Sequence, residues 1–514
     1  MVQRLNRRAI RRASFGVGVA VIVGALGAAP LAVSAAPPSP PGGRSLAANT
    51  RFYVPPPAQG SFQQELQLLF SGQFKAAGLI ADMEATPQAV WLTGETAAQA
   101  AEGALGSQQA DLQVRQAVSQ TVFAAALQRA VPVLVAYNIP GRDCSQYSAG
   151  GAPSDAAYDQ WINALAQGLG SSRAVIILEP DALANLPTDC SAAYQAANPL
   201  ITDATREADV AYGVTTLETD PNASVYIDGG HSAWQSVGTI AGTLVAAGVK
   251  AAQGFFLDVS NYQYATNNVY FGTWVSDCIA LGAGSLTYNY AGCPNQYWNG
   301  GPANGYVATS TYNGGALSPY GVWSETATGD FNTAGTDSWY ASLLGSTVPT
   351  THFVIDTSRN GLSPNNMSTY SAAPYDQDAG VISALQAGNW CNPPGSGTGL
   401  LPTADTAGVP GPLNSYQTVP SLLDAYLWVK TPGQSDGQCD AAGGVRTWSD
   451  SEYTPSISGW PAVTSSTFQT FDPLWSLQTG TVFTDPAAGA WFPQQALQLA
   501  ENANPALSFP FPIS

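Results

Sequence analysis

The segments VPVLVAYNIPGRDC (131–144) and AVIILEPDALANL (174–186) decide the fold. Each starts with a short apolar run that changes abruptly into polar residues. Five other runs in the chain have the same form, and Ala-rich segments typical of helices separate several of them. Runs that are apolar on both faces and separated by helices indicate parallel strands covered by helices. The seven runs are 89–92, 131–137, 174–178, 224–228, 255–259, 352–356 and 425–429.

Seven such strands over roughly 450 residues fit one closed barrel better than two domains. The clearest helix candidates between them are residues 155–170 and 233–252. We therefore predict an α/β fold, a TIM-like (β/α) barrel of seven parallel strands that spans residues 51–514.

Residues 278–345 interrupt this pattern, because they are rich in Gly, Tyr, Asn, Ser and Thr and carry hardly any charge. No regular series of helices or strands is predicted there, so we interpret the stretch as a long loop insertion. Its aromatic side chains either line a sugar-binding surface or pack the loop together, and the sequence favours neither.

The first 35 residues carry five arginines and no acid, followed by an apolar run and a small-residue site at Val33-Ser34-Ala35. This is the pattern of a secretory signal peptide, exported by either the Sec or the twin-arginine route. A membrane anchor is the alternative, but Pro30 and the Gly/Ala content argue against it. Residues 36–50 are expected to form a short Pro/Gly-rich linker or tail, and the protein is expected to be secreted and extracellular.

The charge pattern excludes several function classes. The 514 residues include 17 Lys plus Arg, 35 Asp plus Glu and two histidines, for a net charge of −18. A nucleic-acid surface needs clustered basic residues, so no nucleic-acid partner is expected. A three-histidine zinc site is impossible with His231 and His352 alone. We expect no cofactor, no metal, no membrane contact after signal cleavage, and a monomer.

Six cysteines in an exported chain suggest three disulfides. Fifteen pairings are possible. The sequential pairing closes the shortest loops, and no C-x-x-C spacing favours a structural metal. That pairing is Cys144–Cys190, Cys278–Cys293 and Cys391–Cys439.

Nearly every predicted strand ends in a polar cluster, and a barrel gathers the carboxyl ends of its strands around one mouth. One such cluster alone is usually an ordinary loop. Six in register, in a protein with so few charges, predict a functional site instead. The clusters are 138–143, 179–181, Asp228 with His231, Asn261, Asp356 with Arg359, and 430–436.

Carboxylates are the abundant catalytic groups in these clusters. Asp181 follows a buried strand directly, so desolvation is expected to raise its pKa and keep it protonated, as a general acid requires. Asp143 and Asp436 follow other strands. A protonated acid facing an ionised carboxylate is the arrangement that hydrolyses glycosidic bonds. Nearby Trp91, Trp234 and Trp390 either stack on sugar rings or pack in the core.

Two other functions are alternatives to the hydrolysis of glycosidic bonds. Gly433-Gln434-Ser435-Asp436-Gly437 matches the G-x-S-x-G elbow of α/β-hydrolases. In that fold a histidine base follows the serine in the chain, whereas both histidines here precede Ser435, so we reject a serine hydrolase. A non-catalytic polysaccharide-binding barrel also remains, since stacking tryptophans alone would serve it.

At these residues the sequence resembles glycoside hydrolase family 6, whose members are inverting cellulases. The resemblance covers about residues 50–514 without the insertion and favours the bacterial endoglucanase branch. It implies a distorted barrel of seven parallel strands and the disulfides Cys144–Cys190 and Cys391–Cys439. It rests on YNIPGRDC, ILEPDALANL, YIDGGHSAW, VSNY, FVIDTSRNG, NWCNPPGSGTG and LWVKTPGQSDG.

The resemblance also implies roles. Asp181 resembles the proton donor, Asp143 the aspartate that tunes the donor and helps position water, and Asp436 the proposed base. The family usually has glutamate where this chain has Gln434, which removes a negative charge beside Lys430. The expected substrate-binding residues are Trp91, Tyr137, Asp228, His231, Trp234, Asn261, Trp390, Lys430 and Gln434.

We therefore expect a secreted endo-β-1,4-glucanase that hydrolyses internal bonds of cellulose or related β-glucans by single displacement. Its catalytic residues are expected to be Asp181 as general acid and Asp436 or Asp143 on the base side. The alternatives are an exo-acting cellobiohydrolase of the same family and the non-catalytic binding barrel.

Overall fold

The computed structural model describes residues 46–95, 99, 101–145, 147–285, 287–299, 315–362, 390–407, 422–439, 472, 475, 478–479 and 483–507. Residues 44–514 form one compact unit. The expected signal peptide, 1–35, lies outside the described residues. Among the described residues, none of the helices has the length and apolar character needed to cross a membrane.

Seven parallel strands form one sheet in the order β1-β2-β3-β4-β5-β7-β8, so each crossover moves one place in the same direction. This confirms the predicted seven-stranded, distorted (β/α) barrel. The first and last strands meet where the Ala89 N–H donates to the Trp428 carbonyl at 2.9 Å. The strands are β1 (Val90–Thr93), β2 (Val133–Tyr137), β3 (Ala174–Leu178), β4 (Ala223–Asp228), β5 (Gly254–Leu257), β7 (His352–Asp356) and β8 (Leu423–Leu427).

Both faces of the strands are apolar because both are covered. In β2, Val133, Val135 and Tyr137 pack with inward-facing residues of the other strands, whereas Leu134 and Ala136 pack under the outer helices. Neighbouring side chains of a strand point to opposite faces, so a run that is apolar throughout supplies both cores at once.

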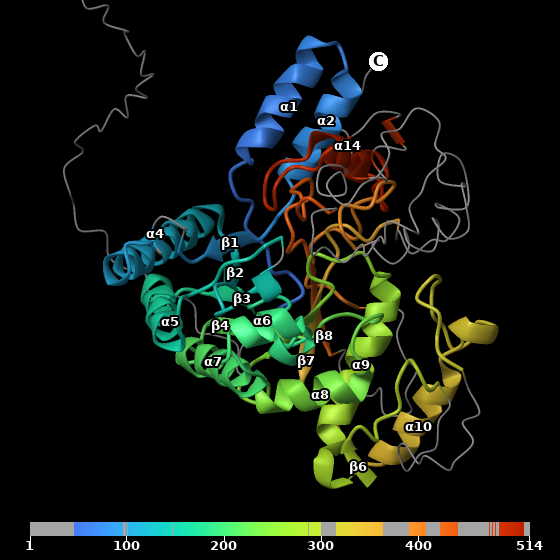
Figure 1. The fold of residues 1–514 in the computed structure, drawn as a ribbon. Helices are drawn as coiled ribbons and strands as arrows, with labels where there is room; N and C mark the ends of the chain where they lie inside the picture. The colour runs from blue at the N-terminus through green and yellow to red at the C-terminus, as the bar shows by residue number, and fades with distance from the viewer. Residues whose placement is uncertain are drawn as a thin grey trace, which may run out of the picture. The chain divides into compact units, whose positions relative to one another are not determined.

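Helices form an arc along the outer side of the curved sheet (Figure 1). Helix α5 begins after Ser154, whose hydroxyl accepts the Ala157 N–H at 3.2 Å, and buries Trp161 and Leu165. The larger helices are α1 (Gln59–Phe70), α2 (Phe74–Glu84), α4 (Ala104–Gln128), α5 (Asp155–Leu169), α7 (Asp203–Leu217), α8 (Val237–Ala246), α9 (Ala265–Leu281), α10 (Ala334–Leu344) and α14 (Pro493–Glu501). The shorter elements are η1 (Asp143–Ser145), η2 (Pro187–Asp189), α6 (Ala192–Ala197), η3 (Ala283–Ser285), β6 (Thr287–Tyr290) and η4 (Gly329–Phe331).

The prediction of a helix over 233–252 is wrong at both ends, because the observed helix is shorter. The side chain of Ser236 accepts the Thr239 N–H at 3.2 Å and caps α8, which starts at Val237. The helix stops at Ala246, and Gly248 follows with a φ of +86°, a conformation that other residues rarely adopt. The preceding residues 233–236 are therefore loop, which leaves Trp234 beside a strand end.

The expectation of an insertion without regular structure is also wrong in part. Residues 278–281 complete α9, and β6 and α10 lie further along. The Trp274 indole of α9 donates to Asp337 of α10 at 2.7 Å, and its ring stacks on that of Trp323. Trp323 is 1% exposed and therefore packs the segment together, whereas Tyr297 and Trp298 are partly exposed.

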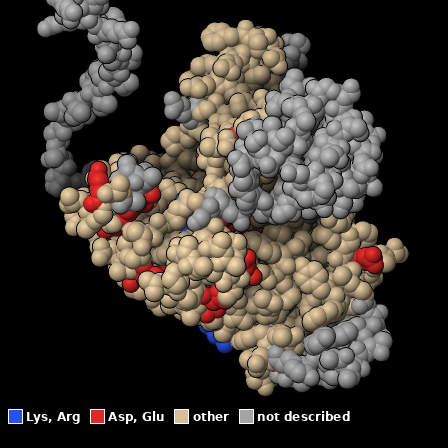
Figure 2. Space-filling view, viewed as in Figure 1, with Lys and Arg blue, Asp and Glu red and all other residues tan. Residues whose placement is uncertain are grey.

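Packing begins earlier than the expected boundary at residue 51. Leu46 is buried against the inner strand residues, and Phe52 forms a parallel bridge with Val131. The structure forms three disulfides in the sequential pairing, Cys144–Cys190, Cys278–Cys293 and Cys391–Cys439. The face drawn in Figure 2 is mostly uncharged, with acidic side chains in scattered groups, in line with the sparse charge of the sequence.

Candidate active site

The loops at the carboxyl ends of the strands carry most of the unusual backbone. Asp143 follows β2, Glu179 and Asp181 follow β3, and Asp258 and Ser260 follow β5, and all five have positive φ angles between 56° and 67°. Side chains other than glycine pay about 1–3 kcal/mol for such conformations, which cluster at active sites where packing enforces them. Strained backbone is thus concentrated at the strand ends of the barrel.

Asp181 lies in the loop that a neighbouring carboxylate holds in place. Asp228, at the end of β4, accepts the backbone N–H groups of Leu183 and Ala184 at 2.9 and 2.8 Å. Burial raises the pKa of Asp181 well above its ordinary value, and the negative charges of Asp228 and Asp143 raise it further, while Lys430 lowers it. Asp181 therefore keeps its proton well above the range of an ordinary carboxyl.

Asp143 lies on the adjacent loop, against Ser148. Its Oδ2 accepts the Ser148 N–H at 2.7 Å and the Ser148 hydroxyl at 2.9 Å. Burial raises the pKa of Asp143, and the bonds to Ser148 and the charge of Arg142 offset part of that rise. The Cys144–Cys190 disulfide ties this loop to the residues that follow β3.

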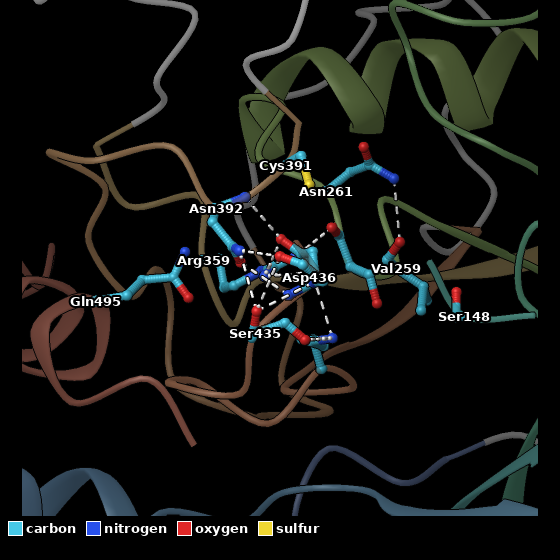
Figure 3. A network of polar contacts seen from close by, with 12 residues as sticks. Ser148, Val259, Asn261, Arg359, Cys391, Asn392, Ser435, Asp436 and Gln495 are labelled. Carbon is cyan, nitrogen blue, oxygen red and sulfur yellow. Dashed lines mark hydrogen bonds and ion pairs between the residues drawn. The ribbon is translucent and has the colours of Figure 1, made fainter. Parts of the chain in front are cut away.

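Asp436 is held by two cations, one of which, Arg359, is labelled beside it in Figure 3. One Nη of Arg359 lies 2.9 Å from both of its oxygens, and the Lys430 Nζ lies 3.3 Å from Oδ1. The Asn392 N–H and the Tyr262 hydroxyl also donate to Oδ2, at 3.0 and 3.2 Å. Burial acts to raise the pKa of Asp436, but the charges of Arg359 and Lys430 outweigh it and the pKa is lowered.

The two ends of this site are therefore held in opposite protonation states. Asp181 is stabilised as the neutral acid, whereas Asp436 is stabilised as the carboxylate. Such a pair can donate a proton on one side and stabilise positive charge or accept a proton on the other.

Trp91, Tyr137 and Lys430 form a group beside the aspartates. The rings of Trp91 and Tyr137 meet edge to face at 5.4 Å, and the Lys430 Nζ lies 5.9 Å from the Trp91 ring centroid. The Tyr137 hydroxyl donates to the Ser148 hydroxyl at 3.2 Å. Burial raises the pKa of Tyr137, and the negative charges of Asp181 and Asp143 raise it further. The half-buried ring of Trp91 thus lies next to Tyr137, which precedes the Asp143 loop, and next to Lys430, which precedes Asp436.

His231 and Trp234 form a second group after β4, with ring centroids 5.4 Å apart. Burial lowers the pKa of His231 to about 3, so its ring is neutral, and its Nδ1 accepts the Ala233 N–H at 3.2 Å. The backbone carbonyl of Trp234 accepts the hydroxyl of Tyr297, which belongs to the insertion, at 2.7 Å. The insertion therefore braces this part of the mouth.

The remaining expected residues lie on three other loops. The ring centroids of Trp390 and Tyr147 lie 6.4 Å apart, and Trp390 directly precedes the disulfide-bonded Cys391. Half-exposed Asn261 donates from its side chain to the Val259 carbonyl at 3.1 Å, as Figure 3 shows. The backbone of Gln434 bridges that of Trp491. Lys430 pairs with Asp436.

Asp228 was expected to bind substrate, yet it is 2% exposed. Its two oxygens accept three backbone N–H groups, those of Leu183, Ala184 and Gly230. The side chain therefore lies behind the loop of Asp181, where it supports that loop.

Glu179 and Asp356 are buried carboxylates that act like Asp228, and the sequence analysis placed both in strand-end clusters without assigning either a role. Glu179 accepts the N–H groups of Asn138 and Ile139 after β2, and burial raises its pKa to about 7. Asp356 accepts those of Val429 and Lys430 after β8. Their position at the last residue of a strand, or the residue after it, is the signal that marks them.

Ser435, the serine of the G-x-S-x-G match, is fully buried, and its hydroxyl donates to the Pro486 carbonyl at 2.8 Å. This geometry agrees with rejecting it as a nucleophile. Among the described residues, Cys439, Asp472 and Asp485 form a group with metal-ligand spacing. Cys439 is in a disulfide, so its sulfur is not a thiolate ligand.

A parallel barrel whose strand-end loops hold one neutral and one ionised carboxyl group defines a class of hydrolytic barrel enzymes. The family model of the glycosyl hydrolases family 6 matches residues 47–503. The chain belongs to this family and is an enzyme that hydrolyses glycosidic bonds.

Individual relatives are similar over most of the chain. Endoglucanase 1 of Streptomyces halstedii is 29% identical over 425 residues, covering 82% of this chain and 92% of that protein. Endoglucanase 1 of Streptomyces sp. strain KSM-9 is 31% identical over 366 residues, covering 71% and 68%. Exoglucanase A of Cellulomonas fimi is 29% identical over 411 residues, covering 74% and 40%.

The solved structure of endoglucanase CEL6B from Humicola insolens has a TM-score of 0.50 and 20% identity to this chain, covering 90% of this chain and 99% of that one. At that identity the likeness supports the fold.

Proposed function

We propose that this protein is a secreted endo-β-1,4-glucanase that cleaves internal bonds of cellulose or related β-glucans with inversion. The observation that carries this proposal is that Arg359 and Lys430 bind the Asp436 carboxylate, while Asp181 lies buried in the loop held by the Asp228 carboxylate, whose charge favours its protonated form. The names of the Streptomyces relatives support the endo mode.

In the proposed reaction, Asp181 gives its proton to the glycosidic oxygen as the bond from that oxygen to the anomeric carbon breaks. A water attacks the anomeric carbon from the opposite face and loses its proton to the base side of the site. The products are two shorter glucan chains: one carries the protonated leaving oxygen as a new hydroxyl at its non-reducing end, and the other has a new reducing end in the α configuration. The positive charge that develops at the anomeric carbon is stabilised by nearby carboxylates.

Two aspartates are candidates for the base, and their surroundings divide the work between them. Asp436 is bound by Arg359 and Lys430, and its lowered pKa makes it a weak proton acceptor. Asp143 has a raised pKa and contacts the Ser148 hydroxyl, which supports a role as final proton acceptor through ordered water. We therefore assign proton uptake to Asp143 and electrostatic stabilisation to Asp436.

Sugar rings are proposed to stack on Trp91, Trp234 and Trp390, because each of these side chains is partly exposed. Tyr137, His231, Asn261, Lys430 and Gln434 would contact hydroxyl groups. Stacking of pyranose faces on aromatic rings orients the chain across the mouth while Asp181 meets the bond to be cleaved.

Two measurements test this proposal. NMR spectra of fresh hydrolysate from a β-1,4-glucan oligosaccharide should give the α-anomer first, and a β-anomer first would refute inversion. Viscosity of carboxymethyl cellulose should fall steeply before many reducing ends appear. A slow viscosity loss with abundant soluble disaccharide would identify an exo-acting enzyme, the mode named for the Cellulomonas relative.

Secretion is proposed from the first 35 residues, with their arginines, apolar run and small-residue site. Fractionation of a host that expresses the full chain tests it. The culture medium should contain a shortened protein whose N-terminal sequence starts near residue 36, and a full-length protein kept in the cells would contradict it.

A further inference from the structure

Arg206 is a buried cation on the outer layer of the barrel that reaches the backs of two catalytic loops. It lies in the first turn of α7 and is 3% exposed. One Nη donates to the Ala182 carbonyl at 3.2 Å, and the other donates to the Pro140 carbonyl at 2.9 Å and, more weakly, to the Gly141 carbonyl at 3.4 Å.

These carbonyls belong to the two loops that carry the aspartates. Ala182 directly follows Asp181, and Pro140 and Gly141 come shortly before Asp143. A guanidinium group is planar and holds its donors in a fixed fork, so one side chain sets the distance between two acceptors. Arg206 therefore links the main chains next to the two carboxyl groups.

Two other groups hold the loop that carries Asp143. Glu179 binds the N–H groups of Asn138 and Ile139, and the Tyr194 hydroxyl donates to the Gly141 carbonyl at 3.0 Å. The charged and titratable groups that interact with Arg206 include Tyr194, Glu179, Asp209, Tyr158 and Asp228.

Stability alone gives little reason for a cation at this position. Burial lowers the pKa of Arg206, and its Nε has no hydrogen-bond partner among the described residues. Replacing buried charges with well-packed apolar side chains is often neutral or stabilising. A buried, incompletely satisfied group of this kind calls for a functional explanation.

We propose that Arg206 is a positioning residue that fixes the Asp181 loop relative to the Asp143 loop, so that the proton of Asp181 meets the glycosidic oxygen. This inference rests on the proposed role of Asp181 as proton donor. Arg206 itself reaches the backbone of the loops and acts through them.

Two substrates distinguish misplacement of the proton donor Asp181 from a general loss of catalytic activity. An unactivated β-1,4-glucan oligosaccharide needs protonation of its leaving oxygen, whereas 2,4-dinitrophenyl β-cellobioside has a leaving group that departs without it. Displacement of a catalytic group by about 1 Å costs on the order of 100-fold in rate. Arg206→Met should therefore lose roughly 10- to 100-fold in kcat on the oligosaccharide, with little change in KM, and much less on the aryl glycoside.

Arg206→Lys keeps the charge but lacks the fork, so it should recover part of the loss, and it replaces Arg206→Met if that variant does not fold. Asp209→Asn is the matched control, because Asp209 lies on the same helix, is 6% exposed and faces Arg206. It should change the melting temperature without changing the ratio of rates on the two substrates.

Equal losses on both substrates, or a lower melting temperature with unchanged kcat, would overturn the positioning role. Asp181→Asn, measured in parallel, keeps the two proposals apart. If that variant lost activity equally on both substrates, the donor assignment would fail first. If its loss were confined to the oligosaccharide while Arg206 variants showed no such selectivity, the inference about Arg206 alone would be wrong.

Discussion

The guanidinium of Arg359 lies 2.9 Å from both oxygens of Asp436, and the side chain of Arg359 is fully buried. The same guanidinium lies 4.1 Å above the ring of Tyr262, whose hydroxyl donates to Asp436. The Tyr262 hydroxyl in turn accepts from Gln495 of α14 at 3.2 Å. The carboxylate, its cation and an aromatic support thus form one buried unit.

Arg359→Met should destabilise the protein by up to about 3–5 kcal/mol, because the buried Asp436 carboxylate loses the closer of its two cations and keeps only the charge of Lys430. Denaturant unfolding monitored by fluorescence measures the loss. The double variant with Asp436→Asn should be more stable than the sum of the single changes predicts. Strictly additive losses would mean that the pair is not coupled.

Asp181→Asn should lower kcat on unactivated glucan by roughly 10²–10⁴-fold, the usual contribution of a general acid. The melting temperature should hold, since the expected defect is chemical. Asp159→Asn on α5 makes the same carboxyl-to-amide change at a half-buried site away from the mouth and should leave kcat unchanged. An Asp181→Asn variant with most of its activity would remove the donor assignment.

Asp228→Asn should move the basic limb of the pH–kcat/KM profile to lower pH. The reaction needs Asp181 protonated, and after burial the charge of Asp228 is the largest influence that raises the Asp181 pKa. Neutralising that charge lowers this pKa, so the proton is lost at a lower pH. Asp330→Asn, exposed in η4, removes the same charge elsewhere and should leave the limb in place. A limb that stays fixed or moves upward would contradict the electrostatic coupling.

The two histidines should affect stability in opposite directions as pH changes. Although burial acts to lower it, the Asp424 carboxylate at 2.8 Å raises the pKa of His352 above 6.5. The stability from this pair is therefore complete below pH 6.5 and is lost as pH rises through the folded pKa. His231, with its pKa lowered to about 3, stays neutral in the fold and costs stability as pH falls below 6.5.

Melting temperatures across pH 5 to 9 test this difference. His352→Gln should lose stability mainly at the acid end, so its curve should approach that of the native protein at high pH. His352 lies at the start of β7, at the opposite end of the strand from Asp356, so kcat should change little. A stability difference that grows with rising pH would contradict the proposed sign.

The strands could be predicted because both of their faces are buried. The runs at 174–178 and 352–356 coincide with β3 and β7, since apolar residues end where the strand leaves the barrel wall. The helix over 233–252 could not be delimited, because Ala- and Gly-rich apolar residues continue beyond the capping Ser236 and the terminating Gly248. Helix α10 was missed because its stability comes from the distant contact between Trp274 and Asp337.

The acidic side chains of the mouth were also predictable, because strand ends in a barrel converge. The residues that support these acidic side chains were not predictable. Arg206 binds main-chain carbonyls 24 and 66 positions away, and any residue can supply a carbonyl, so its partners leave no mark on the sequence. The lowered pKa of Asp436 likewise depends on Arg359, which is 77 positions away.

The first and last strands of the barrel meet at a seam, and Trp91, which is proposed to bind substrate, helps to hold it together. Besides the Ala89 bond to Trp428, the Trp91 indole N–H donates to the Val429 carbonyl at 2.8 Å, so the ring proposed to carry a sugar also joins β1 to the end of β8. A glucan stacked on that ring should make local opening between β1 and the end of β8 less frequent. Amide hydrogen exchange at Ala89 should then slow when an oligosaccharide is bound, which makes the barrel wall a reporter of occupancy.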